Sequence, residues 1–257
     1  DHHRHDGGGG QRMIDWLMAP IDGSRAHDVA GLMSWHARSM VVAWAVLVPL
    51  GVLSARYLKV TPWQDWPSEL DNPTWWTLHR SAQYAAGGVM LLGLALVLVH
   101  RGTVDSLTAQ VWVHKVLGWI VLAIAASQYL SAWSRGTKGG PTAPSPDGSL
   151  HGDHYDMTPR RRAFEWLHKL GGTLAIFISV TVILTGLWQL NAPRWMWLVL
   201  MVWWFGIIVA VALAERTLGA HDTYQAIWGP DAALPGNVRK PIGWRVRKAG
   251  QGPRPPA

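Results

Sequence analysis

Cysteine is absent from the 257-residue chain. Its absence excludes disulfide bonds, thiolate metal sites, iron–sulfur clusters, cysteine nucleophiles and the covalent attachment of c-type haem. Charge is scarce, because charged residues make up 15% of the chain, against about 25% in an average soluble domain. Phenylalanine is also rare, with 3 residues, whereas tryptophan is abundant, with 18. Since tryptophan favours membrane–water interfaces, this imbalance indicates a membrane protein.

Five apolar stretches are each long enough to cross a bilayer, which takes about 20 residues. They run over residues 35–58, 75–99, 111–133, 165–190 and 195–214. Pro49 and the glycines within them are compatible with helix, because both residue types are more frequent in membrane helices. A buried helix of a soluble protein is the alternative for any single stretch. Five in succession predict an all-α membrane protein, a bundle of five transmembrane helices.

The apolar stretches divide the chain into three parts. Residues 1–33 form a polar, extracytoplasmic segment, residues 34–214 the transmembrane domain, and residues 215–257 a basic cytoplasmic tail. Most of the tail is predicted to be irregular.

The basic residues predict the orientation in the membrane. Five spans place the chain ends on opposite sides, here called side A (N-terminal) and side B (C-terminal). Side A holds seven Lys and Arg residues and side B sixteen, so the positive-inside rule makes side B cytoplasmic. The first residue is Asp rather than Met, which fits either a removed leader or a trimmed chain. The composition, rich in Ala and Trp, suggests a bacterial inner membrane.

Four histidines occupy matching places in four successive spans. His36, His79, His114 and His168 each lie near the N-terminal end of their span. Because successive spans are antiparallel, His36 and His114 share a depth near side A, and His79 and His168 share a depth near side B. An ionisable residue in a membrane helix is a functional hypothesis by default. Two pairs of facing imidazoles favour two six-coordinate haem irons.

Further residues suit the binding of two haems. Gly118 and Gly172 follow a ligand histidine by four residues, on the same helix face, where a missing side chain leaves room for a flat macrocycle. Haem propionates need cationic partners. The candidates are Arg38, Lys115 and Arg194 on side A, and Arg80, Lys169 and Arg160–Arg162 on side B.

Other interpretations of the histidines stay open. A single membrane histidine can be a hydrogen-bonded packing residue, and a proton relay or a transition-metal transporter also uses histidines. Either would more naturally have acidic partners in the membrane, and the spans hold almost none beyond Glu165. His100 ends the second span as a boundary residue or an alternative side-A ligand.

The bilayer thickness and the helix rise place the two irons roughly 15–20 Å apart. At this separation electrons could cross the membrane.

The four histidine motifs together resemble one known family. W-H-A-R-S-M at 35–40, W-W-T-L-H-R at 75–80, V-H-K-V-L-G at 113–118 and L-H-K-L-G-G at 167–172 are similar to four core helices of the cytochrome b561 superfamily. The closest branch is the one that follows an extracellular DOMON domain. The resemblance covers residues 34–214 and implies two b-type haems and electron transfer across a membrane. It also implies ligand pairs of alternate helices, His36 with His114 and His79 with His168.

The sequence departs from the family pattern in two ways. Ascorbate-using members resemble one another in a lysine just before the inner-side histidine, where this chain has Thr77 and Leu78. Residues 1–34 are too short for a DOMON domain. The donor and acceptor therefore stay open: a periplasmic redox protein, a quinol or a small reductant.

The expected function is that of a di-haem membrane cytochrome, with a ferric or other trans-membrane reductase as one possible activity. A subunit of a larger membrane complex and a metal or proton transporter are the alternatives. Membrane lipid is an expected partner, since basic residues of the tail can meet anionic headgroups; these are Arg239, Lys240, Arg245, Arg247 and Lys248. Nucleic acid is not expected. The N-terminal H-H-R-H-D run could bind Cu, Zn or Ni, or be a simple chain end.

Overall fold

The structure is a computed structural model that describes residues 7–100, 109–135 and 146–249. Five helices are long and apolar enough to cross a membrane, which confirms the predicted bundle. The first span is continuous over α2 (Gly31–Val41), η1 (Val42–Leu47) and α3 (Val48–Tyr57), and the others are α4 (Thr74–Val99), α5 (Ala109–Ser134), α6 (Pro159–Gln189) and α7 (Arg194–Thr217). Short elements flank them: α1 (Gly7–Met18), α8 (Thr223–Trp228), and the parallel two-residue strands β1 (Ala220–His221) and β2 (Val246–Arg247).

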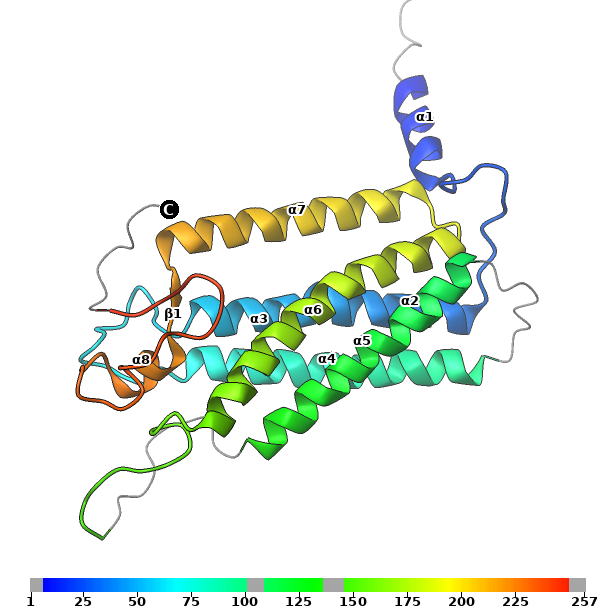
Figure 1. Cartoon of the computed structure of the whole chain (residues 1–257). Coiled ribbons are helices and arrows are strands. Elements are labelled where there is room, and N and C mark those ends of the chain that lie inside the picture. Colours follow the sequence, from blue (N-terminus) through cyan, green and yellow to red (C-terminus); the bar gives the residue numbers. More distant parts are fainter. Residues whose placement is uncertain (1–6, 101–108, 136–145, 250–257) are drawn as a thin grey trace, which may run out of the picture.

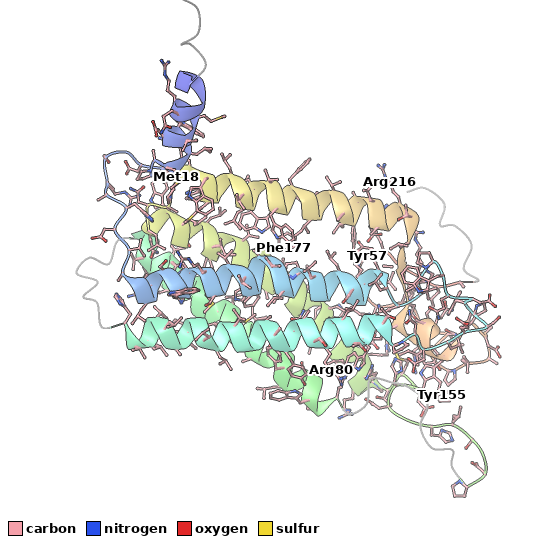
Figure 2. All side chains as sticks on the ribbon, turned by 180° about the vertical axis from the view of Figure 1, so that it is seen from behind. Met18, Tyr57, Arg80, Tyr155, Phe177 and Arg216 are labelled. Carbon is pink, nitrogen blue, oxygen red and sulfur yellow. The ribbon has the colours of Figure 1, made fainter. Side chains whose placement is uncertain are left out.

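The spans pack as two antiparallel pairs. The first span lies along α4, and α5 lies along α6 at an angle to the first pair, while α7 runs along the outside of the bundle (Figure 1). Alanines fill much of the interior, at Ala43, Ala45, Ala86, Ala125 and Ala175. Small residues let membrane helices approach closely. Large apolar side chains face outward instead, such as Phe177 at 70% exposure (Figure 2), as expected of a surface that contacts lipid.

A π-helical turn interrupts the first span at η1, and Pro49 explains it. Proline lacks a backbone N–H and its ring crowds the carbonyl four residues earlier, which here belongs to Ala45. The freed carbonyl of Ala45 accepts a hydrogen bond from the indole Nε1 of Trp203 on α7, at 2.6 Å. This bond attaches the outermost helix to the bundle.

Replacing Trp203 by phenylalanine is expected to destabilise the fold by about 1–3 kcal/mol, because a buried carbonyl loses its donor. Thermal unfolding of the purified protein in detergent would measure the loss. Trp119→Phe is the matched control, since the Trp119 side chain is 57% exposed and its indole has no partner in the described part of the chain. Equal loss in both variants would contradict a specific role for the Trp203 bond.

The structure adds a helix that the sequence analysis missed. α1 lies in the predicted polar N-terminal segment, at the side-A end of the bundle and across the direction of the spans (Figures 1 and 2). Arg194, at the start of α7, stacks over the ring of Trp16, at 5.0 Å, and donates to the Trp16 carbonyl. A backbone bridge pairs Pro20 with Pro193. The predicted N-terminal metal run, residues 1–6, lies outside the described residues.

Residues 218–249 of the predicted tail have little regular secondary structure, but they form a packed segment. This segment folds back over side B and buries Tyr224, Gln225 and Ile227. Lys248 was predicted to meet lipid headgroups. It is instead 6% exposed and donates to the carbonyls of Gly236 and Arg239, at 2.8 and 2.6 Å. The net basic charge of the tail suggested a solvated chain. The ammonium group of Lys248 is instead hydrogen-bonded to backbone carbonyls within the same segment.

Two helices extend beyond their predicted bounds on side B. α6 begins at Pro159 rather than near residue 165, because Thr158 caps it by accepting a hydrogen bond from the Arg161 amide and Pro159 occupies the first turn. The Arg160–Arg162 run is therefore helical. α7 continues to Thr217, so that Glu215 also lies on a helix.

Candidate haem-binding site

The two histidines of the first helix pair are oriented reciprocally. Nδ1 of His36 lies 2.8 Å from the carbonyl of Gly93 on α4, and Nδ1 of His79 lies 2.9 Å from the carbonyl of Gly51 on α3. A carbonyl only accepts, so Nδ1 of each ring carries the proton and donates. The Nε2 lone pair is left free to bind a metal, the usual arrangement for a metal-ligating histidine.

The second helix pair orients its side-A histidine in the same way. Nδ1 of His114 on α5 donates to the carbonyl of Val182 on α6, at 3.0 Å. A Cβ on Gly186 would lie 3.0 Å from the His114 ring, so glycine at this position makes room for the imidazole. His168 differs, because its Nδ1 is buried without a hydrogen-bond partner among the described residues, and its ring stacks on Phe164 at 5.2 Å.

The fold brings the predicted side-B histidine pair together. The ring centres of His79 and His168 are 6.3 Å apart, with the rings inclined by 76°. A metal bonded to one nitrogen of each ring, at about 2 Å as in imidazole–metal bonds generally, needs ring centres roughly 6 Å apart. On side A, His36 and His114 each donate through Nδ1 to a carbonyl of a neighbouring helix. The distance between the rings fits a haem iron at the His79–His168 pair, while the side-A pair and the role of all four histidines as ligands stay predictions.

No cluster of three or more metal-binding side chains occurs within the described ranges. A haem iron needs only two protein ligands, because the porphyrin supplies the rest. The predicted glycines leave the space that a macrocycle needs: a Cβ on Gly172 would meet nothing within 4 Å, and one on Gly118 would meet only Val182, at 4.0 Å.

The predicted propionate partners lie in different settings. Arg38, Arg80 and Lys115 are exposed, and the two guanidinium groups stack over Trp35 and Trp76 respectively. Lys169 is already bound within the chain, because its Nζ lies 3.3 Å from Glu165 Oε2 and 2.8 Å from the carbonyl of Ile242. His100, the open alternative on side A, ends α4.

Sequence reasoning missed Gly51, Gly93 and Gly186, which contact the histidines. Each lies near the far end of a span that also contains a histidine, and so faces the histidine of its antiparallel partner. That spacing is a signal that the sequence already contains.

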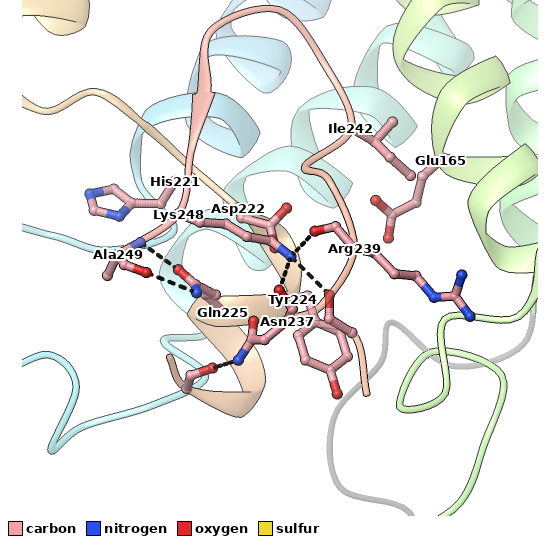
Figure 3. A network of polar contacts seen from close by, with 12 residues as sticks. Glu165, His221, Asp222, Tyr224, Gln225, Asn237, Arg239, Ile242, Lys248 and Ala249 are labelled. Carbon is pink, nitrogen blue, oxygen red and sulfur yellow. Dashed lines mark hydrogen bonds and ion pairs between the residues drawn. The ribbon is translucent and has the colours of Figure 1, made fainter. Parts of the chain in front are cut away.

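A buried polar network closes side B beside the His79–His168 pair. Glu165 binds Arg161 and Lys169 in its own helix, both at 3.3 Å. In the C-terminal segment, Lys248 lies 3.9 Å from Asp222 and donates to backbone carbonyls (Figure 3). Burial raises the pKa of the Asp222 carboxyl. Lys59, just after α3, donates to the carbonyl of His221 at 3.3 Å.

Lys59 is expected to make stability depend on pH. Burial, followed by the nearby charge of Lys169, lowers the pKa of Lys59 from 10.5 to about 7. Between these values the unfolded chain binds a proton that the folded chain does not, so stability rises with pH through this window. Thermal unfolding of Lys59→Met near both ends of the window should show that this rise is lost. The exposed Lys240→Met should keep it, and a wild-type stability that is flat across the window would contradict the assignment.

Comparison with known proteins finds relatives that include proteins named for cytochrome b561. No family profile and no solved structure matches it. It is 26% identical over 212 residues to a cytochrome b561, DM13 and DOMON domain-containing protein of Arabidopsis thaliana, covering 80% of this chain and 20% of that protein. It is 29% identical over 157 residues to ferric-chelate reductase 1 of Bos taurus, covering 61% of this chain and 22% of the reductase. A second Arabidopsis cytochrome b561 and DOMON domain-containing protein is 29% identical over 156 residues, covering 59% of this chain and 27% of that protein. The chain is related to the cytochrome b561 family.

A cytochrome b561 relationship agrees with the geometry of the histidines. It implies haem b as the cofactor that the histidines would hold. The chain spans only 20 to 27% of the length of these three relatives.

Proposed function

We propose that the chain is a di-haem b cytochrome that moves electrons across the membrane, one haem near each face. The main observation is the arrangement of the two histidine pairs at opposite ends of the bundle. Three of the four rings donate through Nδ1 to a backbone carbonyl of a neighbouring helix. In this proposal His36 and His114 hold the side-A haem, and His79 and His168 hold the side-B haem.

The protein's own part in this function is to bind and orient. The carbonyls of Gly51, Gly93 and Val182 fix the tautomer and the rotation of three imidazoles, so that Nε2 points at the metal. Haem supplies the one-electron chemistry when it is bound. The buried alanines bring the helices close together and exclude water from the route between the two ends.

The orientation and the partners belong to the same proposal. Side B, with the larger share of basic residues, faces the cytoplasm and a cytoplasmic or quinol donor, and side A faces an extracytoplasmic acceptor. A bacterial inner membrane is the proposed location. Exposed Arg239, Lys240 and Arg245 on side B are available to anionic lipid headgroups.

Sealed vesicles test electron transfer directly. The chain is reconstituted into liposomes that contain ferricyanide, and dithionite, which does not cross the bilayer, is added outside. Wild-type protein is expected to bleach the internal ferricyanide, whereas His36→Ala and His79→Ala should bleach it no faster than protein-free vesicles. Each variant removes one ligand and with it one step of the route.

His151→Ala is the matched control, because His151 is an exposed histidine on side B. It should retain wild-type transfer. Bleaching by the wild type at the rate of empty vesicles would contradict electron transfer and favour a structural or transport role.

A further inference from the structure

Arg135 is a half-buried cation beside the side-B histidine pair. It directly follows α5, and its guanidinium lies 4.5 Å from the ring centre of Trp76 and 5.6 Å from that of Phe164. These two rings are the aromatic neighbours of the proposed ligands, since Trp76 lies 6.4 Å from His79 and Phe164 stacks on His168. The guanidinium therefore lies between the two ligand-bearing helix ends.

The guanidinium of Arg135 is flanked by aromatic rings, and the charge of Glu165 acts on it without an ion pair between the two groups among the described residues. Its Nε is buried without a hydrogen-bond partner, and no ion pair joins it to a carboxylate in the described part of the chain. The hydrogen bonds that Arg135 makes to described residues use its backbone: its carbonyl accepts from Arg160 at 3.3 Å, and its amide donates to the carbonyl of Ser131 at 3.1 Å. A half-buried guanidinium whose buried Nε has no hydrogen-bond partner is costly, so the site is suited to an anion that the described part of the chain does not provide.

The cations of α4 and α6 at this end of the bundle are either paired with carboxylates or exposed. Arg161 and Lys169 share Glu165, and Arg160 binds Asp153 at 3.1 Å. Arg80 and Arg162 are exposed. Burial, followed by repulsion from Arg161, lowers the pKa of Arg135 only to about 10. Arg135 therefore stays cationic at neutral pH.

A carboxylate is the anion that best fits this place. Planar guanidinium groups bind carboxylates through two parallel hydrogen bonds. A haem held by His79 and His168 would direct its charged propionates away from the apolar middle of the bundle and toward side B, where Arg135 lies. We propose that Arg135 forms a carboxylate-binding site for a propionate of the side-B haem and thereby raises the reduction potential of that haem.

This inference rests on the proposed di-haem function, and its test uses the redox potential rather than activity. The purified full chain is titrated potentiometrically, with the side-B haem identified as the one missing from His79→Ala. Arg135→Gln should lower the potential of that haem, because an unneutralised propionate favours ferric iron. We expect a shift of about tenfold in the oxidised-to-reduced ratio, which is about 59 mV for a one-electron couple. Arg135→Lys should shift it less, since lysine keeps the charge but not the planar fork.

Arg216→Gln is the matched control, because it removes an exposed cation at the side-B end of α7, and it should leave both potentials unchanged. Two haems in the wild type with an unchanged side-B potential in Arg135→Gln would overturn the inference while leaving the proposed function intact. Loss of the side-B haem in Arg135→Gln that Arg135→Lys does not restore would also overturn it. Fewer than two haems in the wild type would instead contradict the proposed function.

Discussion

Alanine at His79 or at His168 is expected to remove the same haem, and alanine at both is expected to remove no more than either change alone. The physical reason is that a six-coordinate haem needs both axial imidazoles, and the two rings face each other at 6.3 Å. His36→Ala and His114→Ala should behave as a second such pair. Haem content per chain and the reduced-minus-oxidised spectrum would measure each loss.

Cross-pair combinations distinguish this pairing from other arrangements. His36→Ala combined with His79→Ala should remove both haems, because the two changes affect different sites. If His79→Ala with His168→Ala removed both haems while His79→Ala with His114→Ala removed one, the pairing would be wrong. His100→Ala should retain both haems if His100 only ends α4, and a lost side-A haem would identify it as a ligand.

Removing the carboxylate of Glu165 is expected to be the most destabilising change outside the histidines. Glu165→Gln should lower the free energy of unfolding by about 3–5 kcal/mol, the usual cost of breaking a buried ion pair. Its partner Arg161 is only 2% exposed, so water cannot replace the missing charge. The change also removes the ion pair between Glu165 and Lys169. Lys169 in turn donates to the carbonyl of Ile242 and so attaches the C-terminal segment to α6. Unfolding in detergent would measure the loss.

Arg160→Gln provides the comparison, because it breaks an ion pair at the same end of α6 whose arginine is exposed. Exposed pairs contribute about 0–1 kcal/mol, so this variant should stay close to wild type. Equal losses in the two variants would show that burial of Glu165 does not determine its contribution.

The spans and the histidine pairs could be predicted from the sequence because both follow from simple periodic rules. Long apolar runs specify membrane helices, and antiparallel succession places His36 opposite His114 and His79 opposite His168. The start of α6 was missed because hydropathy reports the apolar run, whereas the Thr158 cap and Pro159 begin the helix about two turns earlier. The π-helical turn in the first span was not predicted. Its freed Ala45 carbonyl accepts a hydrogen bond from Trp203, which is distant in sequence, on α7.

The polar parts of the chain were harder to predict because their charges are balanced by partners distant in sequence. Lys248 suggested a lipid-facing tail, yet it is enclosed by backbone carbonyls of its own segment. Lys169 suggested a propionate partner, yet it binds Glu165 and the C-terminal segment. In the sequence Arg135 counts only among the sixteen basic residues of side B, because only the fold places it between Trp76 and Phe164.

The ratio of haem b to polypeptide in the purified wild-type chain tests the central claim most directly. A pyridine haemochrome assay combined with quantitative amino-acid analysis would measure it. The arrangement of the four histidines predicts two haems per chain. One haem would contradict the paired sites, and none would remove electron transfer as the function of this bundle.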